Sequence, residues 1–225
     1  MEIFSLGATS TADYSVLMAI VDFLPVLFYF LAAWMVAKDL YNKVSGTAYA
    51  FLAGGALMCF IGGAFKAIWK LMFVFGVNYP FFYTALFPMQ APGFCLYLAG
   101  LIMALRQTKD GANSFGGTSL NMVTAATVTT SLPMIMFQTI GSIGSLVCLA
   151  IFAKRMKLTN AMVCFILSIV FLLAMGALGA TLDTSLAWAN WVDQSVNLVG
   201  QLLFYAGAVI LHKNGFAEKE IGKAA

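Results

Sequence analysis

Five polar side chains lie on one face of the last hydrophobic segment of the sequence, residues 185–211. With 100° per residue on an α-helix, they fall within an arc of roughly 100°. These residues are Asn190, Asp193, Gln194, Asn197 and Gln201. Amides donate and accept hydrogen bonds, whereas a carboxylate accepts them. Because lipid satisfies neither group, the pattern predicts that this face meets the bundle interior or a polar solute.

Four ionisable side chains lie well inside hydrophobic segments. They are Asp22, Lys66, Lys70 and Asp193. An unpaired charge in a membrane span costs about 3 kcal/mol on insertion scales, so we expect opposite charges to pair. In the seven-span topology derived below, all four lie within ~15 Å of the same membrane surface. This depth predicts that Lys66 pairs with Asp22 or Asp193. The alternative is a structural network in which Lys70 extends to the surface.

One further amide lies at a similar depth. Gln90 is roughly 15 Å inside its segment. With the charged residues and the amide face it completes the candidate ligand-binding set: Asp22, Lys66, Lys70, Gln90, Asp193, Gln194, Asn197 and Gln201. Opposite charges and amides together complement a molecule that carries a carboxylate, an amine or hydroxyls. The set therefore predicts a site for a small polar or zwitterionic solute.

Other kinds of chemistry find little support in the sequence. The four cysteines lie in apolar runs without C-x-x-C spacing and are interpreted as buried, reduced packing residues. His212 is the single histidine, which argues against a haem or di-metal site, so we expect no cofactor and no metal. No Ser/His, Asp/Asp or metal–His constellation has a workable spacing, so we expect no enzyme. A net charge of +3 gives no indication of nucleic-acid binding.

The elements that must position these residues are membrane-spanning helices. Of the 225 residues, 62% are hydrophobic and 9% are charged, and long apolar runs alternate with short polar loops. This pattern predicts one all-α, polytopic membrane domain over residues 1–225. The segments long enough to cross are 14–37, 48–77, 81–105, 133–153, 160–182 and 185–211. Residues 111–132, uncharged but rich in Thr, Ser and Gly, form either a seventh crossing or an interfacial extension of the next helix.

The basic residues of the loops favour seven spans. If the chain crosses six times, as a 3+3 inverted repeat, four of ten loop lysines and arginines lie on one face and six on the other. If it crosses seven times, all ten share one face. They are Lys38, Lys43, Arg106, Lys109, Lys154, Arg155, Lys157, Lys213, Lys219 and Lys223. The positive-inside rule then makes residues 1–13 a short extracellular N-terminus and residues 213–225 a short cytoplasmic tail, in the plasma membrane or a bacterial inner membrane.

A short internal similarity divides the seven spans into three, one linker helix and three. Phe23-Leu24-Pro25 is similar to Ser131-Leu132-Pro133, and Gly62 corresponds to Gly176. Glycines seven residues apart also match in the third helix of each set, as Gly93/Gly100 and Gly200/Gly207. The two sets are then parallel repeats. The alternative is a chance similarity between two apolar sequences.

The segment Asp193-Gln194-Ser195-Val196-Asn197 resembles the D-x-S-x-K motif in the seventh helix of microbial rhodopsins. Seven spans and an outside N-terminus suit that family, so the resemblance implies a related architecture. The lysine that forms the retinal Schiff base in the family is Asn197 here. Covalent retinal is therefore not expected.

The three-plus-one-plus-three order is similar to that of the SWEET family of transporters. There, amides on the third and seventh helices flank a sugar, and Gln90 and Asn197 occupy comparable places here. The resemblance implies that these two amides meet across a cavity. The embedded lysines, Lys66 and Lys70, depart from a site for a neutral sugar.

The leading functional hypothesis is a transporter or permease for a small polar or zwitterionic solute that binds in the outer half of the bundle. A second hypothesis is a seven-helix receptor or sensor, in which the same cavity binds a ligand that does not cross. The third is a non-catalytic subunit whose polar face contacts a partner helix, in a homo-oligomer or a larger membrane complex. In all three, the lipid bilayer surrounds the chain.

Overall fold

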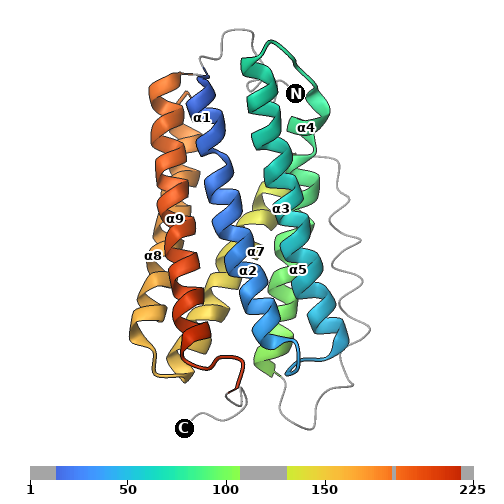
Figure 1. Cartoon of the computed structure of the whole chain (residues 1–225), viewed down its shortest axis with the longest axis vertical. Helices are drawn as coiled ribbons and strands as arrows, with labels where there is room; N and C mark the ends of the chain where they lie inside the picture. The colour runs from blue at the N-terminus through green and yellow to red at the C-terminus, as the bar shows by residue number, and fades with distance from the viewer. Residues whose placement is uncertain (1–13, 107–130, 184–185, 219–225) are drawn as a thin grey trace.

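The computed structural model describes residues 14–106, 131–183 and 186–218, and these form helices joined by short turns (Figure 1). The helices are α1 Val16–Val21, α2 Phe23–Leu40, α3 Gly46–Val74, α4 Pro80–Thr84, α5 Leu86–Arg106, α7 Ser131–Arg155, α8 Thr159–Thr181 and α9 Ala187–Lys213. The predicted N-terminal region 1–13 and most of the tail, 219–225, lie outside the described residues.

Six stretches of the described chain are long and apolar enough to cross a membrane. They are Val16–Leu40, Gly46–Val74, Pro80–Arg106, Pro133–Arg155, Thr159–Thr181 and Ala187–Lys213. This confirms the prediction of an all-α, multi-pass membrane protein. The further crossing predicted over residues 111–132 falls outside the described residues, apart from its last two, which begin α7.

The spanning helices form a closed ring. Going round it, α2 packs against α3, α3 against α5, α5 against α7, α7 against α8, α8 against α9, and α9 again against α2. Large apolar side chains such as Leu24, Leu27 and Leu31 of α2 are exposed on the outside of the ring. The core of a bilayer offers no hydrogen-bond partners, so the chain has to pair its own backbone groups. Helices with an apolar outer face meet this requirement.

Helices α5 and α7 run in the same direction. The Cys95 thiol donates to the Phe137 carbonyl at 3.6 Å, and the Arg155 guanidinium donates to the Leu105 carbonyl at 3.4 Å. The carboxyl ends of the two helices are therefore neighbours. Ser131 begins α7 ~36 Å along the helix from Arg155, so the amino end of α7 lies far from the carboxyl end of α5.

Helices α2, α5, α7 and α9 each have a basic residue in the last turn. We call the end of the bundle where these four helices finish, the lower end in Figure 1, the basic end. Here the Lys43 ammonium donates to the carbonyl of Phe216, whose ring is buried against Phe152. Gly215, with φ of 78°, turns the chain back so that Phe216 can reach this position. Burial lowers the pKa of Lys43, and Asp39 and Glu218 oppose this effect. We call this fold-back the C-terminal latch.

The matched glycines of the proposed repeat make comparable contacts. A Cβ at Gly93 or Gly100 would meet side chains of α3, and one at Gly200 or Gly207 would meet side chains of α8. In each set, therefore, the third helix turns its glycines toward the second. The remaining match differs, because Gly62 faces α5 whereas a Cβ at Gly176 would meet open space. The internal repeat stays a prediction.

Gly55 allows a close approach of α3 to α5. We predict that a larger residue at this position destabilises the fold. A Cβ there would lie 2.6 Å from the Gly93 carbonyl oxygen and 2.7 Å from the Tyr97 nitrogen. Both are backbone atoms, so Gly55→Ala should lower the free energy of unfolding by about 2 kcal/mol. Gly54→Ala is the matched control, because its Cβ would meet nothing within 4 Å. Denaturation in mixed micelles, followed by circular dichroism, measures both. Equal effects of the two substitutions would contradict this packing.

Candidate functional site

A buried ion pair links three parts of the ring. The Lys70 ammonium of α3 lies 2.5 Å from Asp22 Oδ2 and donates to Asn190 Oδ1 of α9 at 3.1 Å. Their exposed fractions are 2% for Lys70, 5% for Asp22 and 3% for Asn190. Breaking such a buried pair leaves an uncompensated charge, which costs several kcal/mol. Lys70 therefore holds α3, α9 and the junction of α1 with α2 together.

The position of Asp22 follows from the local sequence. Asp22 lies between α1 and α2, and Pro25 follows three residues later. Proline has no N–H to donate to the carbonyl four residues before it, and its ring clashes with that carbonyl. The helical hydrogen bonding is therefore interrupted at Val21, next to Asp22.

Aromatic side chains surround the lysine, and we call this end of the bundle the aromatic end. The Lys70 ammonium lies 5.3 Å from the centre of the Tyr14 ring, a distance that allows a cation–π interaction. The pKa of Tyr14 is raised to about 12, mainly because the side chain is buried. Trp69 packs against Tyr14 and Tyr83 and donates to Asn78 Oδ1 at 3.0 Å. These rings shield the ion pair.

The predicted charge cluster exists, but Lys66 does not pair with Asp22, the first of the two predicted alternatives; pairing of Lys66 with Asp193 stays a prediction. Lys70, not Lys66, meets Asp22, and Lys70 is buried and does not extend to the surface. Lys66 lies one turn away on α3 and is half-buried, as is Asp193 on α9. Both lysines attract the Asp193 carboxylate electrostatically. All four ionisable residues thus share one region, as their depths predicted.

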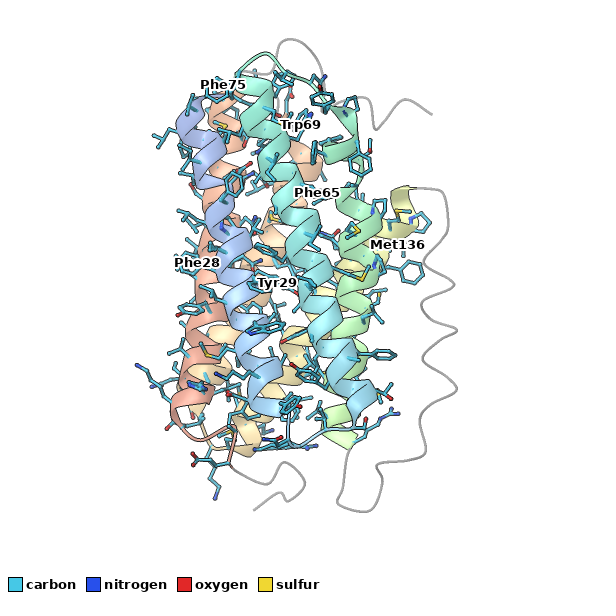
Figure 2. All side chains as sticks on the ribbon, turned by 45° about the vertical axis from the view of Figure 1, so that its right-hand side comes forward. Phe28, Tyr29, Phe65, Trp69, Phe75 and Met136 are labelled. Carbon is cyan, nitrogen blue, oxygen red and sulfur yellow. The ribbon has the colours of Figure 1, made fainter. Side chains whose placement is uncertain are left out.

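A cavity lies deeper in the ring, about 10 Å along α9 from Asn190, and its mainly apolar wall contains several polar side chains. Figure 2 shows the difference in level, with Trp69 near the aromatic end and Tyr29 near the middle of the bundle. The cavity has a volume of about 30 Å³, room for about two water molecules. It is lined by Tyr29, Phe94, Tyr97, Ser142, Ser145, Leu146, Ser168, Leu172, Val196, Asn197, Gly200, Gln201 and Phe204.

The cavity contains two of the eight predicted site residues. Asn197 and Gln201 line it, with Gln201 Nε2 3.5 Å from Asn197 Oδ1. Gln194 is buried on α9 without lining the cavity. Gln90 Nε2 donates to the Cys59 carbonyl of α3 at 3.4 Å, so its amide is directed to α3. The structure therefore does not place Gln90 opposite Asn197.

Sequence reasoning missed the hydroxyl groups of the cavity. Tyr29, Tyr97 and Ser168 each lie within an apolar stretch of their helices, without a polar neighbour three or four residues away. The sequence contained a weak indication that Ser142 and Ser145 line a cavity. They are three residues apart, on one helix face, beside Gly141 and Gly144. Nothing in the sequence indicated that these serines lie close to Asn197, since their proximity depends on the order of the helices in the ring.

The described residues contain no group of three His, Cys, Asp or Glu side chains that could hold a metal ion. The four cysteines are free, and the thiols of Cys59 and Cys95 donate to backbone carbonyls. No family model matches the chain, and no curated protein or solved structure shows a significant match. The resemblances to microbial rhodopsins and SWEET transporters therefore rest on the quoted residues alone.

We predict strong coupling between Lys70 and Asp22. Lys70→Met and Asp22→Asn should each lower the free energy of unfolding by about 3 kcal/mol, because each leaves the other charge buried and unpaired. The double substitution should lose less than the sum, by about 1–3 kcal/mol.

Lys66→Met is the matched control, because it removes a half-buried lysine one turn away on the same helix. Denaturation of the purified variants in mixed micelles gives all four free energies. Additive effects of Lys70→Met and Asp22→Asn, or a larger loss for Lys66→Met, would show that the pair does not hold the bundle together.

Proposed function

We propose that this chain is a membrane transporter or permease that moves a small polar solute through the centre of its helical ring. The observation that supports the proposal is the cavity, in which hydroxyl and amide groups gather inside a ring with an apolar outer face. Polar groups at this depth in a membrane are expensive, and they commonly mark the path of a solute. The proposed activity moves the solute without changing its bonds.

Side-chain contacts lie between the cavity and each end of the bundle. Toward the aromatic end lie the Lys70–Asp22 pair, Asn190 and the rings around them. Toward the basic end lies the C-terminal latch, beside which His212 Nδ1 is 2.9 Å from Asp39 Oδ1. Since the cavity holds only about two waters, we infer that a solute enters when one end opens and leaves when the other does.

We also propose that the chain crosses the membrane seven times. The parallel course of α5 and α7 supports this topology, because the connection between them has to return to the opposite end. As a helix, residues 107–130 would reach ~36 Å, more than the ~30 Å of a bilayer core. In a cell membrane, the positive-inside rule makes the basic end cytoplasmic and the N-terminus external.

Cysteine labelling tests the topology. Single cysteines at Asp110 and Lys157, in a variant without the four native cysteines, should react with an impermeant maleimide only after intact cells are permeabilised. A cysteine at Tyr79, an exposed residue at the aromatic end, should react without permeabilisation. Labelling of residue 110 but not 157 in intact cells would refute the seven-span topology.

Flux through proteoliposomes tests the activity. We expect the purified protein to accelerate the entry of at least one of glycerol, urea, glycine and methylammonium over protein-free liposomes. Asn197→Leu should reduce that flux at least tenfold, because it replaces a cavity amide with an apolar side chain. Gln90→Leu is the matched control and should keep most of the flux, since Gln90 faces α3.

Two outcomes would count against a transporter. If none of the four solutes enters faster than in protein-free liposomes, the proposal fails. A solute that stabilises the protein against heat without crossing would favour the receptor or sensor hypothesis instead. Size-exclusion chromatography and thermal unfolding of Asn197→Leu separate a lost pathway from a lost fold.

A further inference from the structure

We propose that the cavity selects an uncharged solute rich in hydrogen-bond donors, of the chemical kind represented by glycerol and urea. This inference rests on the proposed transport activity and narrows its substrate class. It departs from the zwitterionic solute that the sequence allowed.

The cavity is lined by uncharged residues. None of the described side chains that line the cavity is a lysine, arginine, aspartate or glutamate. The next carboxylate along α9, Asp193, lies one turn nearer the aromatic end, where both Lys66 and Lys70 attract it. A charged solute in the cavity would therefore have no counter-charge of its own, at a depth where an unpaired charge is costly. The cavity thus favours a neutral molecule.

Most hydroxyl groups around the cavity donate their protons to backbone carbonyls. Carbonyl oxygens accept hydrogen bonds only, so a hydroxyl beside one must donate its proton. The hydroxyls of Ser142, Ser145 and Ser168 lie 3.1, 2.7 and 2.9 Å from backbone carbonyl oxygens, and the Tyr97 hydroxyl lies 3.2 Å from the carbonyl of Ala33. All four protons are engaged. These groups therefore offer only lone pairs to a solute.

Tyr29 and the amides complete the set. The Tyr29 side chain is 8% exposed, lines the cavity, and its hydroxyl has no hydrogen-bond partner among the described nitrogen and oxygen atoms. The thiol of Cys59, a weak partner, lies beside it. The contact between Gln201 and Asn197 is at the limit of hydrogen-bonding distance, at 3.5 Å. Both amides can therefore exchange this contact for a solute.

Acceptors thus exceed donors around the cavity. The serine hydroxyls and Tyr97 offer acceptors alone, whereas Tyr29 and the amide nitrogens offer donors. A solute with several O–H or N–H groups and no charge fits this balance. Glycerol and urea share that chemistry and differ in shape, so their relative rates show which shape the cavity prefers.

The test compares four solutes in proteoliposomes by the rate of osmotic swelling or of radiolabel uptake. We expect glycerol or urea to enter at least tenfold faster through the protein than glycine, a zwitterion, or methylammonium, a cation. Tyr29→Phe should lower the faster neutral flux about tenfold by removing a hydroxyl whose weak thiol partner a solute can replace. Tyr205→Phe is the matched control, because Tyr205 packs against Phe28 and does not line the cavity.

The outcomes separate this inference from the proposed function. If glycine or methylammonium enters fastest, the protein still transports but the neutral-solute inference is wrong. If no solute enters, the proposed function itself fails. If glycerol or urea enters fastest but Tyr29→Phe changes nothing, the assignment of Tyr29 is overturned. Should Tyr29→Phe not fold, Ser168→Ala provides a second variant, because it removes a cavity acceptor and should also lower the neutral flux.

Discussion

A lysine ammonium inside an apolar bundle requires a partner, and much of this structure follows from where Lys70 finds one. Lipid and apolar side chains provide no counter-charge, so folding has to bring Asp22 and Asn190 to Lys70. These residues come from the first, second and last described spans. The same requirement helps to close the ring, because it keeps α3 and α9 on either side of the α1–α2 junction.

The sequence predicted the helices and the common level of the charges along the bundle, because both depend on local composition and on the 1.5 Å rise per residue. It did not predict which lysine meets Asp22. Lys66 and Lys70 are four residues apart on one helix face, so periodicity treats them alike. The choice depends on how the α1–α2 junction sits beside α3, which is a long-range contact. The interruption before Pro25, in contrast, is a local effect of proline and needs no long-range contact.

The cavity was predictable only in part, for a similar reason. Asn197 and Gln201 belong to a polar face and were found by periodicity, whereas Ser168 was not. A lone hydroxyl within an apolar stretch, such as that of Ser168, becomes part of a site only when the ring places α8 beside α9. Gln90 has the expected depth but the wrong direction. A Cβ at Gly62 or Gly63 would meet Gln90, so the missing side chains of these glycines leave room for its amide against α3.

Charges and neutral polar groups lie at different levels along the bundle. The energetic cost of placing charges in a membrane explains why the charges lie nearer its surface. A charge costs most at the membrane centre, where this chain has hydroxyls and amides, and the ion pair lies nearer the aromatic end. A neutral cavity can exchange its water for a solute with similar hydrogen bonds. In the proposed transporter, α2 and its N-terminal junction make contacts at both ends of the bundle, through Asp22 at one end and Asp39 at the other. Both contacts involve α9, through Asn190 and His212. A tilt of α2 against α9 is therefore the simplest motion that would open one end while keeping the other closed.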